Sequence, residues 1–399
     1  MGNKYYDVII IGGGIHGVGV AQAVAAAGHS ALVLEQGTLA CGTSSRSSKL
    51  IHGGLRYLEG MQLSLVRECL RERALLLKNA PSLVKLQPFY IPVYKDTRRR
   101  PWLIRSGLML YALLGGFNRA NLFRSLRKSQ WDDLDGLDTI GLEAVFRYYD
   151  AQTDDAALTR AVMSSAQSLG AELKSNAQFI AGHLHHDGVI IQYQKNEETS
   201  TCEARTVVNA AGPWANHVLA KIVPQQLPQA IDLVQGTHIL LNGTLTNGIY
   251  YMEAPCDQRA VFAMPWQGKT LVGTTETAFD PNTDPSNVAP LEDEARYLMK
   301  TIACYFPEYR NLQTNPICSA FAGLRVLPHT DNKNNSPFSQ PRETVLQTDR
   351  GDSPRLLTIY GGKLTAYRAT AEKCINKLQS SLPKRKAIAN TRKLPLQKP

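Results

Sequence analysis

The sequence predicts an α/β fold (α+β overall) that combines a Rossmann-like nucleotide-binding domain with a second region of antiparallel β-sheet. Three observations support this prediction. A strand, a glycine-rich loop, a helix and a second strand follow one another within residues 6–35. Residues 226–319 contain four short segments of alternating character, rich in β-branched and aromatic residues, at 231–241, 249–253, 260–265 and 270–275, which we expect to be strands. The length of 399 residues exceeds that of a usual single domain, so we expect two domains.

The N-terminal unit begins with residues 6–11, which are nearly all Val and Ile, as in a buried strand. The loop GGGIHG at residues 12–17 follows, and residues 18–27 have helical character. A second strand over residues 30–34 ends at Glu35. This order of elements predicts a dinucleotide site.

Each residue type in this unit has a mechanical role. Gly12 permits the tight turn, Gly14 lets the backbone approach a pyrophosphate, and Gly17 lets the helix pack closely on the strand. The N–H groups at the start of the helix, around Ile15, face the phosphates. Glu35 follows where a carboxylate takes the ribose hydroxyls. The motif does not separate FAD from NAD, because both present the same half to it.

Residues 43–49, TSSRSSK, carry five hydroxyls and two cations directly after this unit. A polar surface turn is one interpretation. The position after the ribose-binding strand instead favours an extended segment along a second phosphate or a flavin ring. A nicotinamide enzyme would continue the alternation of strand and helix here, so we expect FAD.

Composition limits the class of protein. Apolar residues make up 43% and charged residues 20% of the chain, which is ordinary for a soluble enzyme. The seven scattered cysteines contain no C-x-x-C pair, so we expect reduced thiols in a cytoplasmic setting and neither a disulfide framework nor a metal site. The apolar run after Asp7 is interrupted by glycines, and we interpret it as a strand rather than a signal peptide.

The net charge of +10 is concentrated in residues 95–128 and in a basic tail, residues 383–399. Such clusters form solvated faces or mobile tails, or attract anionic surfaces. Nothing in them resembles a nucleic-acid-binding module. The stretch 102–116 is apolar apart from Arg105, and the uncharged run from 106 to 117 has 12 residues, which is too short to span a bilayer. It predicts either a core helix or a helix that lies on a membrane surface.

Residues 44–59, SSRSSKLIHGGLRYLE, closely resemble the signature of the FAD-dependent, respiratory glycerol-3-phosphate dehydrogenases, in the D-amino-acid-oxidase-like flavoprotein superfamily. Further matches extend the resemblance over about residues 5–380 and lie at residues 153–156, 207–214, 236–238, 272–275, 322–328 and 360–368. The resemblance implies a glutathione-reductase/D-amino-acid-oxidase type of FAD-binding domain, with an antiparallel sheet that caps the flavin. Family members usually continue into a helical C-terminal domain, so we expect a short form.

One FAD has to touch motifs that are far apart in the sequence, so the FAD-binding domain is expected to be discontinuous, over residues 1–90, 150–225 and 320–382. The substrate-capping domain is expected at residues 91–149, with the membrane-facing segment, and at residues 226–319. The expected cofactor-binding residues are Gly12, Gly14, Ile15, Gly17, Glu35, Thr43, Ser44, Ser45, Ser48, Lys49, Leu50, Ala211, Gly212, Trp214, Gly361, Gly362, Lys363, Leu364 and Thr365.

The resemblance implies oxidation of sn-glycerol 3-phosphate to dihydroxyacetone phosphate, with electrons passed to a quinone at the inner face of the cell membrane. It implies that the phosphate is held by Arg56, Tyr57, Arg342 and Lys363. It also implies that Arg325 stabilises the alkoxide. Arg325 lies in an apolar stretch, where a buried charge needs an anionic partner such as a bound substrate. His52, our first choice, and His238 are both candidates for the base.

Other functions stay open. The same fold serves oxidoreductases and oxidases that act on other hydroxy acids or amines, and a non-catalytic flavoprotein is a further alternative. The cationic residues favour a phosphorylated substrate, because a simple hydroxy acid needs fewer cations. Oxygen as the acceptor and a homodimeric state are also left open by the sequence.

Overall fold

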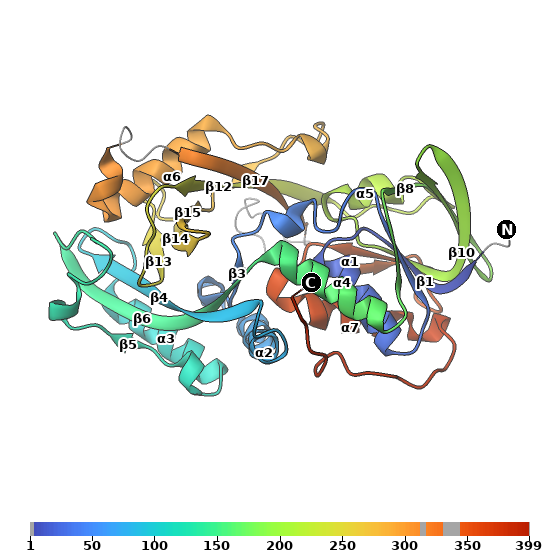
Figure 1. The fold of residues 1–399 in the computed structure, drawn as a ribbon, viewed down its shortest axis with the longest axis horizontal. Coiled ribbons are helices and arrows are strands. Elements are labelled where there is room, and N and C mark those ends of the chain that lie inside the picture. Colours follow the sequence, from blue (N-terminus) through green and yellow to red (C-terminus); the bar gives the residue numbers. More distant parts are fainter. Residues whose placement is uncertain (1–3, 312–316, 330–343, 399) are drawn as a thin grey trace.

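The computed structural model describes residues 4–311, 317–329 and 344–398. The chain forms two β-sheets that lie side by side, each packed against its own helices (Figure 1). The chain passes between the sheets several times, so each sheet combines segments that are distant in the sequence.

The first sheet has a parallel centre with the order β7-β2-β1-β10-β19, and an antiparallel extension, β8 and β9, beside β10. Its strands are β1 (Tyr5–Ile11), β2 (Ala31–Glu35), β7 (Glu172–Ser175), β8 (Ala177–His185), β9 (Gly188–Lys195), β10 (Glu198–Asn209), β11 (Ile222–Val223), β18 (Val345–Thr348) and β19 (Leu356–Tyr360).

Apolar side chains leave β1 and β2 on both faces, as expected of a buried parallel sheet. One face packs against α1 (Ile15–Ala26), α4 (Asp155–Ser168) and α7 (Tyr367–Leu378). The other face packs against β8, β9 and the short helix α5 (Ala215–Leu219). The predicted Rossmann-like unit is therefore confirmed, with a strand and a helix slightly longer than expected.

The second sheet has the order β16-β12-β15-β14-β13-β4-β6-β3, with β17 on β12 and β5 on β6. Its pairs among the described residues are antiparallel except for β13 with β4. Its strands are β3 (Leu50–Ile51), β4 (Val84–Tyr94), β5 (Arg124–Ser125), β6 (Leu142–Thr153), β12 (Ile231–Leu241), β13 (Ile249–Glu253), β14 (Ala260–Trp266), β15 (Lys269–Gly273), β16 (Thr277–Ala278) and β17 (Ile317–Pro328).

Helices cover both faces of this sheet as well. α2 (Leu63–Asn79) and α3 (Pro101–Leu114) share one apolar core with it, and α6 (Glu292–Tyr305) packs on the other face. The strands predicted at 231–241 and 249–253 are confirmed to the residue, and the one predicted at 270–275 ends at Gly273. The domain boundaries stay a prediction, because β4 and β17 straddle the expected limits at residues 90 and 320.

The basic tail is part of the packed structure rather than a free extension. Leu396 is buried in the core with α1 and α4, and its N–H donates to the carbonyl of Asn79, 2.7 Å away. The N–H of Ile388 donates to the carbonyl of Ala26. Arg385 pairs with buried Asp7 at 2.9 Å. The tail runs along the outside of the first-sheet half of the molecule (Figure 1).

The apolar stretch at 102–116 forms helix α3, which begins with Pro101. Ile104, Leu108 and Tyr111 are buried against the second sheet. Among residues 4–311, 317–329 and 344–398, no helix combines the length and the apolar character needed to cross a bilayer.

Candidate active site

A cavity of about 940 Å³ runs between the two sheets. It begins at the glycine loop and Glu35 of the first sheet and ends among side chains of the second sheet. A cavity at the carboxyl ends of parallel strands is the usual place for a dinucleotide in this type of fold.

The glycine loop fits a dinucleotide for local steric reasons. Gly12 has a φ of +108°, and a Cβ there would lie 2.6 Å from the carbonyl oxygen of Ala210. Gly17 lies directly against the Gly12 carbonyl, so it serves helix packing and does not face the cavity. The carboxylate of Glu35 accepts hydrogen bonds from the N–H groups of Gly13 (2.6 Å) and Gly37 (2.8 Å). These contacts fix its orientation at the cavity wall.

The segment 43–49 is not extended as predicted, because Thr43–Ser45 forms a 3₁₀ turn. The hydroxyl of Ser44 accepts a hydrogen bond from the N–H of Ile15 at 2.9 Å, and the hydroxyl of Thr43 donates to the carbonyl of Leu324 at 2.9 Å. The segment therefore connects the start of α1 in the first sheet with β17 in the second.

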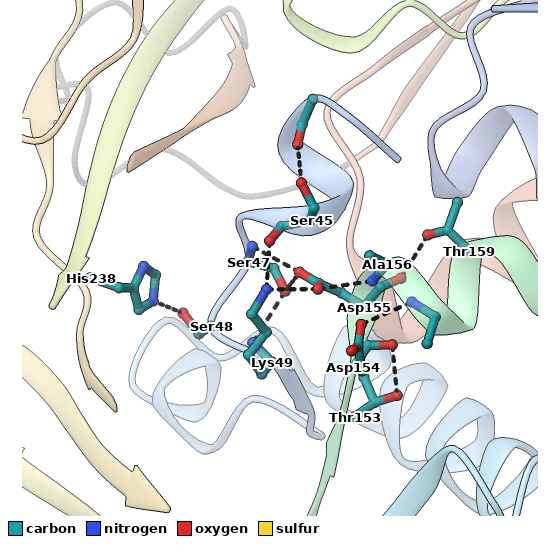
Figure 2. A network of polar contacts seen from close by, with 12 residues as sticks. Ser45, Ser47, Ser48, Lys49, Thr153, Asp154, Asp155, Ala156, Thr159 and His238 are labelled. Atoms are coloured by element: carbon teal, nitrogen blue, oxygen red, sulfur yellow. Dashed lines mark hydrogen bonds and ion pairs between the residues drawn. The ribbon is translucent and has the colours of Figure 1, made fainter. Parts of the chain in front are cut away.

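A buried ion pair holds the end of this segment (Figure 2). The ammonium of Lys49 lies 2.7 Å from Asp155 and also donates to the carbonyl of Ser45 at 2.5 Å. Asp155 accepts three further hydrogen bonds, from the N–H (2.9 Å) and the hydroxyl (2.7 Å) of Ser47 and from the N–H of Ala156 (2.9 Å). Asp155 is completely buried, and the next residue back, Asp154, caps α4 by accepting from the N–H of Ala157. Lys49 is thus oriented toward α4.

The structure brings most of the predicted site residues to the cavity. Within the part of the chain that it describes, the lining leaves out Gly17, Ser45 and Lys49. Arg342 lies outside the described residues. The predicted residues that line the cavity are Gly12, Gly14, Ile15, Glu35, Thr43, Ser44, Ser48, Leu50, His52, Arg56, Tyr57, Ala211, Gly212, Trp214, His238, Arg325, Gly361, Gly362, Lys363, Leu364 and Thr365.

The turn before α7 lines the cavity beside the glycine loop. Gly361 and Gly362 have positive φ values of 72° and 117°, and a Cβ at Gly362 would collide with the ring of His16. Burial lowers the pKa of His16 to about 4, so this ring is neutral at pH 7. The hydroxyl of Thr365 accepts a hydrogen bond from the N–H of His52 at 3.1 Å, which fixes the backbone of His52.

A chain of contacts joins the predicted substrate-binding residues. The guanidinium of Arg56 lies 5.9 Å and the ammonium of Lys363 lies 4.6 Å from the ring centre of Tyr57. Arg56 also contacts Glu276 at 3.3 Å, and Arg325 contacts the same carboxylate oxygen at 2.7 Å. Cations from three distant segments therefore meet at the second-sheet end of the cavity.

His238 is a less accessible candidate than His52. Its ring stacks on Phe321 with ring centres 4.9 Å apart, and its Nε2 lies 3.0 Å from the hydroxyl of Ser48 (Figure 2). Its Nδ1 is buried without a hydrogen-bond partner among the described residues. Burial first, and then the positive charges of Arg325 and Lys49, lower the pKa of His238 to about 3. The ring is neutral at pH 7 and a weak base.

Sequence reasoning missed two features of the site. An aromatic wall from the second sheet lines the cavity and comprises Phe89, Tyr148, Tyr251 and Phe262, with neighbouring ring centres 5.2–6.1 Å apart. Glu276 was also missed, although it follows directly on the recognised motif at residues 272–275. Only its position after that motif could have indicated it.

The fold and the cavity define a dinucleotide-dependent enzyme of the Rossmann-like class. Comparison with known proteins is more specific, because the model of the FAD dependent oxidoreductase family matches residues 7–368. The chain belongs to this family, and its cofactor is FAD. The residues present fit that cofactor, since the glycine loop, Glu35 and the Gly361–Gly362 turn line one continuous cavity.

Two curated relatives and one solved structure show which members of the family this chain is similar to. Glycerol-3-phosphate dehydrogenase of Pseudomonas aeruginosa is 37% identical, over 94% of this chain and 72% of its own length. D-erythritol 1-phosphate dehydrogenase of Brucella abortus is 34% identical, over 94% of this chain and 74% of its own. The structure of glycerol-3-phosphate dehydrogenase from Bacillus halodurans, complexed with FAD, superimposes with a TM-score of 0.75 at 26% identity, covering 98% of this chain and 68% of that one.

The buried ion pair leads to a prediction for stability. Lys49→Met leaves the carboxylate of Asp155 buried without its cation, so we expect the free energy of unfolding to fall by about 3 kcal/mol. FAD retention should weaken as well, because the pair holds the Ser44–Ser48 segment. Urea unfolding and gel filtration with flavin detection measure both. Lys85→Met, at an exposed position of β4, should stay within about 0.5 kcal/mol of the wild type. Equal stability of the two variants would contradict the role given to the pair.

The neutral ring of His238 leads to a second prediction, for pH dependence. Its pKa is about 3 in the folded state and 6.5 when unperturbed, so the unfolded chain binds more protons between these values. Stability from this residue is therefore lost as the pH falls below about 6.5. We compare the drop in the free energy of unfolding between pH 6.5 and pH 4.5. This drop should be about 2 kcal/mol smaller for His238→Gln than for the wild type, because one pKa unit corresponds to about 1.4 kcal/mol. Urea unfolding at several pH values tests this, with exposed His186→Gln as the control. Parallel curves would exclude a buried neutral ring.

Proposed function

We propose that this chain oxidises sn-glycerol 3-phosphate at its secondary alcohol to dihydroxyacetone phosphate. The observation that carries the proposal is the meeting of Arg56, Arg325 and Lys363 at the second-sheet end of the cavity. A phosphate dianion held in a partly dry pocket needs several cationic hydrogen-bond donors. The names of the two curated relatives reported above, a glycerol-3-phosphate dehydrogenase and a D-erythritol 1-phosphate dehydrogenase, support the same class of substrate.

In this proposal the cationic residues divide between two tasks. Lys363, Arg56 and Tyr57 hold the phosphate, with Arg342 as a further predicted donor. Arg325 projects from β17 and stabilises the negative charge that develops on the alcohol oxygen. Bound FAD supplies the two-electron acceptor for the carbon that is oxidised.

We propose His52 as the base that takes the hydroxyl proton. It lines the cavity within the same loop as Arg56, and its backbone is fixed by Thr365. His238 is the weaker candidate, because its Nε2 contacts Ser48 and its low pKa makes it a poor proton acceptor at neutral pH.

A four-carbon polyol phosphate is the second candidate substrate, and the similarity to the D-erythritol 1-phosphate dehydrogenase favours it. Both substrates carry one phosphate and a neighbouring alcohol, so the cation cluster suits either. The aromatic wall formed by Phe89, Tyr148, Tyr251 and Phe262 would bound the rest of the molecule.

We further propose that the protein binds the inner membrane surface and passes electrons to a quinone. Support comes from α3 and the turn after it, where an apolar stripe is exposed at helical spacing. Its members are 51–69% exposed and comprise Trp102, Met109, Leu113 and Phe117. The exposed cations Arg98, Arg105, Arg124 and Lys128 belong to the basic cluster at residues 95–128, which also contains this stripe. An exposed apolar stripe with nearby cations suits the interface of an anionic bilayer.

Anaerobic mixing tests the proposed reaction directly. We expect sn-glycerol 3-phosphate to bleach the flavin of the purified holoenzyme, and Arg325→Ala to retain FAD but to slow bleaching by about 10²-fold or more. Stopped-flow absorbance gives both rates. Bleaching by D-erythritol 1-phosphate alone would favour the second candidate. Bleaching only by an unphosphorylated hydroxy acid or an amine would exclude the proposed substrate class.

Vesicle binding tests the membrane proposal. We expect the protein to cosediment with anionic vesicles at low salt and to be released at high salt, because screening weakens its attraction to the headgroups. The double variant Trp102→Ser, Leu113→Ser should bind at least about tenfold more weakly, because two large apolar side chains no longer insert. Leu227→Ser removes an exposed apolar side chain elsewhere and should bind normally. Equal binding of all three proteins, or equal binding to neutral vesicles, would overturn the proposal.

A further inference from the structure

We infer that Glu276 is a positioning residue of the substrate site, which holds the guanidiniums of Arg56 and Arg325 in a fixed relative orientation. The inference rests on the proposed function, because it concerns the two arginines to which that function gives the substrate. None of the sequence motifs that carry the family resemblance includes Glu276.

The geometry of the contact is specific. A single oxygen, Oε1 of Glu276, lies 2.7 Å from Nη1 of Arg325 and 3.3 Å from Nη2 of Arg56. The carboxylate is the most buried member of this triad, with a side-chain exposure of 10% against 24% for Arg325 and 36% for Arg56. The acid therefore lies behind the arginines, and the arginines are the groups that reach the cavity.

The backbone around Glu276 is fixed by a second, buried carboxylate. Glu294, in the first turn of α6, accepts hydrogen bonds from the hydroxyls of Thr275 (2.6 Å) and Thr277 (2.7 Å), one on each side of Glu276. It also accepts from the hydroxyl of Thr237 on β12 at 2.6 Å. Burial alone would raise the pKa of Glu294, but these hydrogen bonds and one from Gln235 lower it, so the group stays ionised. Neighbours on both sides of Glu276 thus face α6, and its own side chain faces the arginines.

The side chain of Arg325, on β17, reaches Glu276 by crossing the neighbouring strand β12 at a glycine. β17 pairs with β12 so that Gly323 lies opposite Gly236. A Cβ on Gly236 would lie 2.5 Å from Nη2 of Arg325, so only glycine leaves room for the guanidinium to cross. The same Nη2 donates to the carbonyl of Thr275 at 2.6 Å. Arg325 is therefore held at two atoms, by the backbone of Thr275 and by the side chain of Glu276.

This arrangement has a consequence for catalysis. Two guanidiniums that share one carboxylate are kept close despite their mutual repulsion, and the separation between the phosphate donor and the alkoxide donor is set before substrate binds. Without the carboxylate the arginines still attract an anion, and more strongly, because one negative charge is gone. Their alignment at the reacting alcohol is lost. Loss of Glu276 should therefore slow the reaction without weakening phosphate binding.

The test compares FAD-loaded wild type with Glu276→Gln, Glu276→Asp and the control Glu143→Gln. Glu143 on β6 pairs with Arg100 at 2.6 Å, and neither residue lines the cavity. For Glu276→Gln we expect kcat with sn-glycerol 3-phosphate to fall by about 10²-fold while KM stays level or decreases, the pattern of an interaction that acts in the transition state. Glu276→Asp should lie between the wild type and Gln, and Glu143→Gln should match the wild type.

Binding of inorganic phosphate, followed through the flavin spectrum, gives a readout that needs no turnover. We expect Glu276→Gln to bind phosphate as tightly as the wild type or more tightly. Weaker phosphate binding with a raised KM would show general damage to the site and overturn the inference, as would turnover within about threefold of the wild type. If sn-glycerol 3-phosphate fails to reduce even the wild type, the proposed function fails. In that case the phosphate comparison still decides on Glu276: binding as tight as in the wild type or tighter supports the inference, and weaker binding overturns it.

Discussion

The buried ion pair between Lys49 and Asp155 lies where the chain crosses twice between the sheets. One crossing leads from β2 through residues 43–49 into β3, and the other leads from β6 through Asp154 into α4. The pair ties the two crossings together, and the N–H of Thr153 donates to the carbonyl of Lys49 beside it. A buried charge pair is costly to break, so the two sheets are held in one relative position at this point.

The cavity depends on that position because its two ends belong to different sheets. The glycine loop and Glu35 come from the first sheet, whereas Arg325 and the aromatic wall come from the second. A shift of one sheet would separate the cofactor site from the cation cluster, and hydride transfer tolerates little displacement of the reacting atoms. The segment 43–49 therefore has a structural task as well as a place in the cavity wall. Its hydroxyls contact α1, β17 and α4 in turn.

The sequence predicts well what local signals determine. The Val- and Ile-rich strand before the glycine loop and the strands at 231–241 and 249–253 follow from composition and alternation alone. The fine structure of 43–49 does not, because its turn depends on Leu324 and Asp155, which are distant in the chain. Lys49 is predicted as a cofactor-binding residue from its place among the serines, but the partner of its ammonium, Asp155, lies 106 residues away and could not be predicted. An arginine beside glycines is recognisable in the sequence as a candidate binding residue. Glu276 lies among threonines, as in an ordinary turn, and its role is apparent only in the folded structure, where it contacts Arg325.

The two sheets also separate two kinds of constraint on the enzyme. At the first sheet the cavity lining faces FAD, which is always the same molecule. Glycines and the carboxylate of Glu35 are therefore enough there, and substitutions at these positions are hard to accommodate. On the second sheet the cations have to match a substrate, and relatives named for a three-carbon and a four-carbon polyol phosphate are about equally similar to this chain. An acid placed behind two arginines suits such a site, because it sets their spacing without occupying the space of the substrate. Differences in substrate within this group should then arise from the second sheet, around Glu276 and the aromatic wall, while the cofactor end stays the same.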